Sequence, residues 1–236
     1  MRRAAIDIGN TRIKCALFDE QGRIISRMVF DFLNEVNEWL QKEQVKNAIV
    51  SSVGRYQLQK IPGLDLITLD HRTKTPFKNL YTTPETLGVD RIAAMAAACT
   101  SYPEQAVLVF DVGTCMTIDL MHPDQTYKGG NISPGLDMRL RAMQSMTDRL
   151  PYSSHKEATD APGHSTLSAL ANGVMWGMRF EMDGYISHFR DIYPDLVVVG
   201  CGGDISHFDK QLKFKIFAAP DFVLQGLYEL LLLNEN

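Results

Sequence analysis

The sequence is poor in the residues that build metal and disulfide frameworks. It has four cysteines, Cys15, Cys99, Cys115 and Cys201, and none of them forms a C-x-x-C pair. This scatter predicts neither a zinc site nor a disulfide framework, and each thiol is expected to be a small buried side chain in a reducing compartment. The histidines are also dispersed and form no H-E-x-x-H motif, so a metalloprotease is not predicted.

Long apolar runs and an excess of positive charge are missing as well. The longest apolar candidate, Leu227 to Leu233, is interrupted by Glu229 and is far shorter than the roughly 20 residues that cross a bilayer. The N-terminal apolar stretch stops at Asp7, which is not typical of a signal peptide. The net charge of −4 argues against a nucleic-acid surface. We therefore expect a cytoplasmic protein that binds neither a membrane nor nucleic acid.

What the sequence does contain is an order of elements that repeats. Strands are expected at residues 4–8, 12–18, 23–30 and 48–53 in the first half, and at 106–112, 116–121, 127–132 and 196–200 in the second. Helices are expected at 33–42, 92–100, 134–146, 165–189 and 221–233.

Two Asp-x-Gly turns mark this repeat. They begin at Asp7 and Asp111, which are 104 positions apart in a chain of 236 residues. A spacing close to half the chain favours an internal duplication. The expected result is an α/β protein of two lobes, residues 1–100 and 101–236, each with a mixed β-sheet flanked by helices.

The first turn has the residue types of a phosphate-binding loop. It reads Asp7-Ile8-Gly9-Asn10-Thr11-Arg12-Ile13-Lys14. Gly9 would let backbone N–H groups approach an anion, and Lys14 could reach phosphate oxygens. Asp7, at the strand end, could hold a hydrated Mg²⁺ that bridges those phosphates. The alternative is an ordinary hairpin in which Asp7 caps the turn, and one such turn alone would favour that alternative.

The second turn, Asp111-Val112-Gly113-Thr114, repeats the pattern of strand, Asp, Gly and polar residue. Two such turns that face each other across a cleft would clamp phosphates and place two carboxylates for cations. Two unrelated hairpins are the alternative, but the shared strand context and the spacing favour the clamp. The chain has neither the G-x-x-x-x-G-K-[ST] loop nor the G-x-G-x-x-G fingerprint.

Two glycine-rich segments indicate places where a ligand or another segment of the chain comes close to the backbone. The segment 200–204 reads G-C-G-G-D after an apolar strand, and either lies under adenosine or forms a strand-to-helix turn capped by Asp204. The segment 129–135 reads G-G-N-I-S-P-G, and either approaches a substrate or forms a helix entry with Pro134 in the first helical turn.

Two helix starts carry candidate substrate contacts. In the first, Asp90 could accept a proton from a substrate hydroxyl and Arg91 could pair with a substrate carboxylate. From residue types alone, however, a helix cap at Asp90 is favoured. In the second, Thr166 either is part of a helix cap or makes a hydrogen bond to a substrate. Small residues along that helix, such as Gly173 and Gly177, would allow a helix of a second subunit to pack closely.

Together these motifs resemble the actin/hexokinase/Hsp70 superfamily and, within it, the type III pantothenate kinases. The matching segments are D-I-G-N-T-R-I-K, G-V-D-R, D-V-G-T, G-G-N-I-S-P-G, G-G-D and P-D-F-V-L-Q-G-L. The paired turns are shared by the superfamily, whereas G-V-D-R followed by D-V-G-T is more specific to the kinase. The resemblance implies a duplicated ribonuclease H-like (actin-like ATPase) fold. It also implies ATP-dependent phosphorylation of pantothenate to 4′-phosphopantothenate, the first step of coenzyme A biosynthesis.

The resemblance also implies a role for each candidate residue. Residues 7–14 look like the ATP phosphate loop, with Mg²⁺ held through water near Asp7, and Thr114 looks like a further ATP contact. Asp90 resembles the proton acceptor, which overrides the cap interpretation. Asp111 resembles the residue that holds a monovalent cation, K⁺ or NH₄⁺. The implied pantothenate contacts are Tyr81, Gly88, Val89, Asp90, Arg91 and Thr166.

The family further implies a homodimer in which the partner subunit closes the pantothenate pocket. One departure from the pattern is Cys201, which stands where a hydroxyl-bearing residue would be at home. Three alternatives remain at this point. They are a non-catalytic regulatory or accessory protein on the same scaffold, a kinase for another small hydroxy acid, and an enzyme that hydrolyses ATP or polyphosphate.

Overall fold

The computed structural model describes residues 2–52, 58, 61–154 and 162–235. The chain divides into two compact units. The first consists of Met1–Glu104, Met121–Gly129 and Asp221–Asn236, and the second of Gln105–Leu120 and Gly130–Pro220. Each unit is described by itself below. The lobe boundary at residues 100 and 101 stays a prediction.

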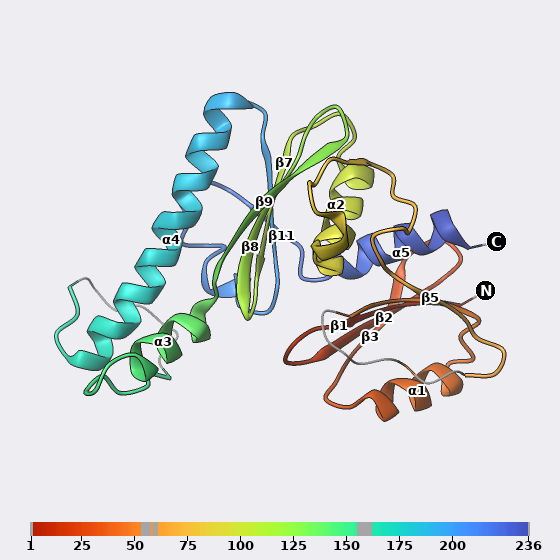
Figure 1. The fold of residues 1–236 in the computed structure, drawn as a ribbon, viewed down its shortest axis with the longest axis horizontal. Helices are drawn as coiled ribbons and strands as arrows, with labels where there is room; N and C mark the ends of the chain where they lie inside the picture. Colours follow the sequence, from red (N-terminus) through yellow and green to blue (C-terminus); the bar gives the residue numbers. More distant parts are fainter. Residues whose placement is uncertain (1, 53–57, 59–60, 155–161, 236) are drawn as a thin grey trace. The chain divides into compact units, whose positions relative to one another are not determined.

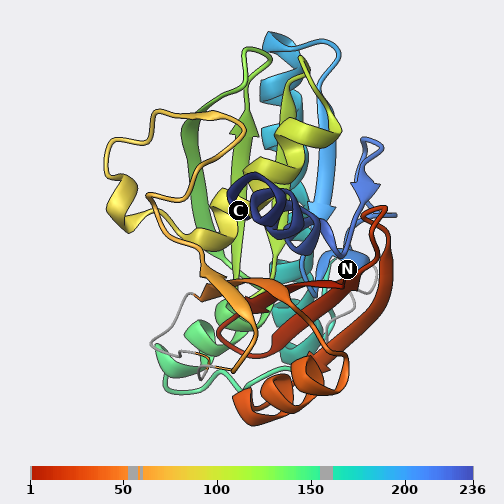
Figure 2. The same cartoon turned by 90° about the vertical axis from the view of Figure 1, so that its right-hand side faces the viewer.

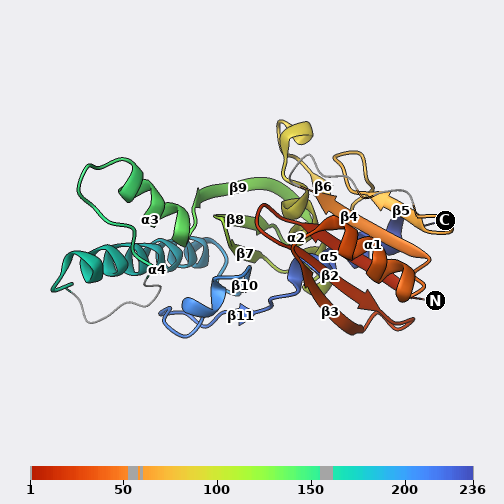
Figure 3. The same cartoon turned by 90° about the horizontal axis from the view of Figure 1, so that it is seen from below.

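The first unit is built on a five-stranded sheet with the order β3-β2-β1-β4-β5. The strands are β1 (Arg3–Ile8), β2 (Ile13–Phe18), β3 (Ile24–Phe30), β4 (Asn47–Ser52) and β5 (Asp65–Thr68). The first three strands pair antiparallel, and β4 and β5 continue the sheet parallel to β1. Figure 3 shows this sheet with α1 (Leu33–Lys42) lying across it.

Helices cover both faces of this sheet. Figures 1 and 2 show α1 on one face and α5 (Phe222–Asn234) on the other. Helix α5 also packs against α2 (Val89–Ser101). Their backbones touch at Gly226, where an added Cβ would lie 1.8 Å from the carbonyl oxygen of Ala93. The N-terminal end of α2 is therefore supported by a helix that itself packs on β1 and β4.

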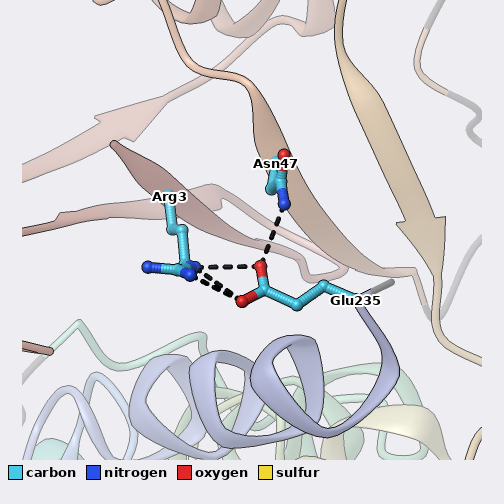
Figure 4. A network of polar contacts seen from close by, with 3 residues as sticks. All are labelled: Arg3, Asn47 and Glu235. Atoms are coloured by element: carbon cyan, nitrogen blue, oxygen red, sulfur yellow. Dashed lines mark hydrogen bonds and ion pairs between the residues drawn. The ribbon is translucent and has the colours of Figure 1, made fainter. Parts of the chain in front are cut away.

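The end of α5 is tied to the beginning of β1 and β4 by one carboxylate. Glu235 accepts hydrogen bonds from Nε and Nη2 of Arg3 at 2.6 to 3.1 Å, and from Nδ2 of Asn47 at 2.9 Å. Figure 4 shows both side chains pointing toward this carboxylate. Bidentate pairing of this kind is among the stronger polar contacts in proteins, so it fixes α5 to the sheet.

The second unit repeats the strand order of the first. Its strands are β7 (Val107–Val112), β8 (Cys115–Met121) up to Leu120, β9 (Thr126–Pro134) from Gly130 on, β10 (Val197–Cys201) and β11 (Phe217–Ala218). Their order, β9-β8-β7-β10-β11, corresponds strand by strand to β3-β2-β1-β4-β5. As in the first unit, the two last strands are parallel to the central one. The sheet order thus supports the predicted duplication.

The second unit buries its core under two helices, α3 (Leu136–Ser145) and α4 (Thr166–Ile192). They lie together on one side of the sheet in Figure 1. Phe110, Met116 and Met178 are fully buried between these layers. Among the described residues, no helix is long and apolar enough to cross a membrane.

The predicted elements are largely confirmed, with shifted ends. The helix at 33–42 is α1, and the strand at 48–53 is β4 up to Ser52, because Val53 lies outside the described residues. The placement of Pro134 in a helical turn is wrong. Pro134 ends β9, and α3 begins at Leu136 after the N-cap Gly135, since a proline is tolerated at a strand end, where its missing N–H costs nothing.

Short elements outside the prediction also occur. They are the strands β5, β6 (Lys78–Asn79) and β11 and the 3₁₀ turns Pro84–Thr86 and Ile205–His207. The part of β9 that belongs to the first unit pairs with β6, with Lys78 opposite Thr126 and Asn79 opposite Tyr127.

Candidate active site

The first Asp-x-Gly turn joins β1 to β2 through residues 9–12. Asp7 is the fifth of six residues in β1. The turn is closed by the Gly9 N–H, which donates to the carbonyl of Arg12 at 3.1 Å. The Gly9 N–H is thus used inside the turn, and the expectation that Gly9 lets other backbone N–H groups approach an anion stays a prediction. Asn10, Thr11 and Arg12 are exposed at the tip of the turn.

The hydrophobic members of the same segment belong to the core. Ile8 and Ile13 are 2% and 6% exposed and face the interior of the first unit. Their side chains are buried in the core and are therefore not available to a ligand. Lys14, in contrast, is half-buried and lies directly opposite Asp7 in the antiparallel register of β1 and β2.

Asp7 has a second neighbour that the sequence analysis missed. Ser51 of β4 lies opposite Asp7 in the parallel register, and its hydroxyl donates to Oδ1 of Asp7 at 2.8 Å. Ser51 is fully buried. The signal in the sequence was a hydroxyl residue at the end of the next buried strand, since the carboxyl ends of parallel strands meet at one edge of a sheet.

The pKa of Asp7 lies above its ordinary value. One of the causes of this shift is the charge of a second carboxylate. Burial raises this pKa most, the hydrogen bond from Ser51 lowers it, the charge of Asp90 raises it and the charge of Lys14 lowers it. Asp7 and Asp90 are therefore close enough to repel each other. A cation would relieve this repulsion, so the residues present fit a magnesium ion held partly by Asp7.

Asp90 is held at the start of α2 by its own helical turn. The N-cap is Gly88 and not Asp90, so the cap interpretation is wrong. Oδ1 of Asp90 accepts the N–H of Arg91 at 2.9 Å. A Cβ on Gly88 would lie 2.5 Å from the same oxygen, so only a glycine leaves room for this carboxylate position. Val89, which lies between Gly88 and Asp90 in the sequence, is the first helical residue and is half-buried.

Arg91 and Tyr81 lie beside Asp90. Arg91 is only 5% exposed, and its guanidinium carbon is 5.6 Å from the ring centre of Tyr81. The backbone N–H of Tyr81 donates to Oδ1 of Asn79 at 3.0 Å. The first unit thus links Asp7 with Lys14 and Asp90, and Arg91 with Tyr81; their roles as site residues stay a prediction.

The second Asp-x-Gly turn is shorter and is packed by glycines. Asp111 is the fifth of six residues in β7, and the Gly113 N–H donates to the carbonyl of Cys115 at 2.9 Å. Gly202 has a φ of +89°, and a Cβ there would lie 2.5 Å from Oδ1 of Asp111 and 2.3 Å from the carbonyl oxygen of Val112. The loop after β10 therefore contacts the carboxylate of Asp111 directly.

A third glycine completes this turn. A Cβ on Gly135 would lie 2.0 Å from the carbonyl oxygen of Gly113, and the Gly135 N–H donates to the carbonyl of Thr114 at 3.1 Å. The result is a carboxylate, Asp111, with backbone carbonyl oxygens nearby and glycine backbones packed directly on them. The carbonyls of Val112 and Thr114 each accept one N–H, from Asp204 and from Gly135, and a carbonyl oxygen keeps a second lone pair. Oxygen ligands of this kind suit a weakly held monovalent cation, so the residues present fit that ion.

A metal ion held by side chains alone is not indicated. Among the residues that the structure describes, no group of three or more His, Cys, Asp or Glu could hold one. Magnesium commonly takes only one or two carboxylates and completes its shell with phosphates and water. The single carboxylates Asp7 and Asp111 therefore agree with ions that a nucleotide helps to bind.

The remaining candidates lie in the second unit. Thr114 is exposed in the second turn. Thr166 is the first residue of α4 and is also exposed, next to the N-cap Ser165, whose hydroxyl accepts the N–H of Ser168 at 3.2 Å. The cap of this helix is thus Ser165, which leaves the hydroxyl of Thr166 outside the capping role.

Comparison with solved structures identifies the fold. A Campylobacter jejuni protein assigned to the Baf family of transcriptional activators has a TM-score of 0.66 at 19% identity, over 98% of each chain. The activator of the 2-hydroxyisocaproyl-CoA dehydratase from Clostridium difficile, with bound ADPNP, has a TM-score of 0.55 at 13% identity, over 98% of this chain and 94% of that one. These likenesses and the repeated sheet order identify the duplicated ribonuclease H-like, actin-like fold, as predicted.

The family follows from sequence. The profile of the type III pantothenate kinases matches residues 4–188. A type III pantothenate kinase from Phocaeicola vulgatus is 43% identical over 241 aligned residues, which cover 98% of each chain. The chain therefore belongs to the type III pantothenate kinase family, and the predicted resemblance is confirmed.

Proposed function

We propose that this protein transfers the γ-phosphoryl group of ATP to the terminal hydroxyl of pantothenate, which gives 4′-phosphopantothenate and ADP. Membership of the family supports the reaction. The observation that carries it in this chain is Asp90, which is fixed over Gly88 by the Arg91 N–H and lies close to Asp7. A base beside a phosphate-binding turn is what transfer to a hydroxyl requires.

In this mechanism Asp90 accepts the hydroxyl proton of pantothenate as its oxygen attacks the γ-phosphorus. The bond from that phosphorus to the bridging oxygen of ADP breaks in the same step. Arg91 pairs with the carboxylate of pantothenate, and Tyr81, Gly88 and Val89 line the acceptor. Because phosphoryl transfer needs little covalent help from the protein, most of the rate enhancement comes from positioning and charge.

The first turn binds the phosphates of ATP. Asn10, Thr11 and Arg12 are exposed at its tip, and Lys14 supplies a positive charge beside Asp7. Asp7 would hold Mg²⁺ through water, and the ion, when bound, neutralises phosphate charge. Ser51 keeps the carboxylate of Asp7 oriented.

The second turn holds the monovalent cation, K⁺ or NH₄⁺. Asp111 and the carbonyl oxygens next to Gly202 and Gly135 support this role. Thr114 in the same turn contacts ATP. Purified protein that has been freed of K⁺ and NH₄⁺ should regain activity when either ion is added back.

We also propose a homodimer in which α4 forms the contact and Thr166 reaches pantothenate. Two apolar side chains of α4, Leu167 and Phe180, are 39% and 57% exposed. Gly173 and Gly177 have no atoms within 4 Å of an added Cβ, so another helix could approach closely there. Light scattering of the purified protein measures the oligomeric state, and a monomer at micromolar concentration would contradict this proposal.

The decisive experiment is an assay with ATP, Mg²⁺, K⁺ and a panel of small hydroxy acids that includes pantothenate. We expect phosphopantothenate to form, and Asp90→Asn to lower kcat by about 10²- to 10⁴-fold. Asp65→Asn, at an exposed position of the same unit, is the matched control and should stay near wild type.

Each other outcome has a clear meaning. Full turnover by Asp90→Asn would refute the base assignment. Faster phosphorylation of another acid would change the substrate, and ADP release independent of any acceptor would indicate hydrolysis. Absence of any catalysed reaction would favour a regulatory protein on this scaffold.

A further inference from the structure

A row of aromatic side chains lies behind Tyr81, outside the residues assigned so far. The rings of Tyr81 and Tyr127 are nearly parallel, with 6.2 Å between their centres and 6° between their planes. Phe77 meets Tyr127 edge-on at 6.1 Å. The guanidinium of Arg91 lies 5.6 Å from the centre of the Tyr81 ring. These spacings are those at which aromatic pairs and cation–π contacts are favourable.

The row runs from the core to the proposed acceptor site. Tyr127 is fully buried, whereas Tyr81 is half-buried. Tyr127 is therefore enclosed by the core, whereas Tyr81 has exposed atoms that could contact a substrate. Arg91 is buried as well, and its guanidinium lies against the Tyr81 ring.

The backbone holds Tyr81 and Tyr127 in register. Tyr127 lies opposite Asn79 in the β6–β9 pair, and its carbonyl accepts the N–H of Leu80 at 2.8 Å. Asn79 in turn accepts the N–H of Tyr81 at 3.0 Å. A shift of Tyr127 would therefore be transmitted to Tyr81 through both ring and backbone.

Gly129 borders the edge of the Tyr81 ring. It has a φ of +132°, and a Cβ there would lie 3.4 Å from Cδ2 and Cε2 of Tyr81. Gly129 therefore lies within van der Waals reach of the ring, in a backbone conformation that favours glycine. The Tyr81 ring is therefore restricted in position by its contacts with Tyr127, Gly129 and Arg91.

We propose that Tyr127 is a positioning residue for the acceptor: it fixes the ring of Tyr81 and, through it, the guanidinium of Arg91, so that the acceptor hydroxyl meets Asp90. Gly129 serves the same end by leaving room for the ring. This inference rests on the proposed function. Small displacements of a bound reactant cost much of the rate of transfer, so a residue two layers from the substrate affects acceptor use without touching it.

The test compares three variants by steady-state kinetics with each substrate varied in turn. Tyr127→Leu removes the stacked ring and should raise the KM for pantothenate about three- to tenfold, with the KM for ATP unchanged. Tyr127→Phe keeps the stack and should stay within about twofold of wild type. Tyr228→Leu is the matched control, because Tyr228 is also a buried, stacked ring of this unit, 4.2 Å from Phe18, and should leave the KM for pantothenate unchanged.

The outcomes separate this inference from the proposed function. If the wild type makes phosphopantothenate and Tyr127→Leu leaves its KM unchanged, or raises both KM values equally, the positioning role is overturned and the function stands. If the wild type makes no product, both are overturned. Should Tyr127→Leu fail to fold, Phe77→Leu takes its place, because it removes the ring that meets Tyr127 edge-on. We then expect a smaller rise in the KM for pantothenate, and an unchanged KM would overturn the positioning role.

Discussion

The two Asp-x-Gly turns occupy equivalent places in the two units and are built differently. Asp7 and Asp111 are both the fifth residue of the central strand of a sheet with the same strand order. Around Asp7 the neighbours are charged or polar side chains, Lys14, Asp90 and Ser51. Around Asp111 the neighbour is the backbone of Gly202, and Gly135 packs on the turn that follows, at Gly113 and Thr114.

Under the proposed function, this difference would let one duplicated frame serve two ligands. The first turn has four residues and an exposed polar tip, which suits phosphates and a strongly hydrated divalent ion. The second has two residues, and a glycine backbone packs directly on its carboxylate, where we propose a weakly hydrated cation. The frame sets where each carboxylate lies, and the residues packed against it determine what it binds.

The two units also differ in the strand beside each carboxylate. Ser51 lies opposite Asp7, and Cys201 lies opposite Asp111 in the same parallel register. Cys201 stands where a hydroxyl-bearing residue would be at home. In the first unit the corresponding residue, Ser51, donates its hydroxyl to the carboxylate of Asp7. A thiol is a weaker hydrogen-bond donor than a hydroxyl, so the two carboxylates have different support.

The largest effect is expected where glycine packing is broken. Gly202→Ala should lower the free energy of unfolding by about 3 kcal/mol, because it combines a left-handed backbone with overpacking. Gly9→Ala in the first turn, where a Cβ would lie 3.3 Å from the Arg12 carbonyl oxygen, should cost less than about 1 kcal/mol. Urea denaturation measures both.

Gly203→Ala is the control for this pair, since an added Cβ there has no atom within 4 Å. Its unfolding free energy should stay close to that of the wild type. Equal losses for Gly202→Ala and Gly9→Ala would show that the two turns do not differ in the way described.

Next in size is the effect of removing the charge of Asp7. Burial raises the pKa of Asp7, so the folded state binds this proton more tightly than the unfolded chain. The contribution of this group to stability therefore falls as pH rises above the ordinary value of 3.8. Asp7→Asn should raise the free energy of unfolding at pH 7 and lower kcat about 100-fold.

Thermal unfolding and the kinase assay, carried out on the same preparation, measure the two effects. Asp111→Asn is the comparison: it should abolish activation by K⁺ and lower the rate less than Asp7→Asn does. A variant Asp7→Asn that is both less stable and fully active would contradict the charge-rich description of the first turn.

The smallest effect is expected at the opposite end of the strands that carry Asp7 and Ser51. Hydrogen bonds from Arg3, with smaller help from Asn47, hold the pKa of Glu235 below its ordinary value. Their stabilisation is present above pH 4.5 and is lost as pH falls through the lower pKa of the folded state. Glu235→Gln should cost about 1 kcal/mol at pH 7, and the difference from wild type should vanish in acid.

Glu38→Gln, at an exposed position of α1, is the control and should show no such pH-dependent difference. A loss for Glu235→Gln that persists unchanged at low pH would mean that the contact acts through packing and not through its charge.

Much of the fold could be predicted from local pattern. The periodic helix at 33–42 and the apolar strands before Asp7 and Asp111 are local features, and the structure places them as expected. Pro134 was misplaced because a glycine and a proline before an apolar periodicity mark a helix entry and a strand end equally well. The two-residue strands β6 and β11 had no local signal, since their pairing with distant strands creates them.

The sequence by itself determined the duplication, the two carboxylates and the family, because these depend on residue types at fixed spacing along the chain. Only the tertiary structure decided which side chains surround each carboxylate. Ser51 reaches Asp7, and Gly202 reaches Asp111, through parallel pairing of strands far apart in sequence. Tyr127 meets Tyr81 in the same way. Spacing along the chain does not encode such contacts, since they arise when separate segments are packed into one core.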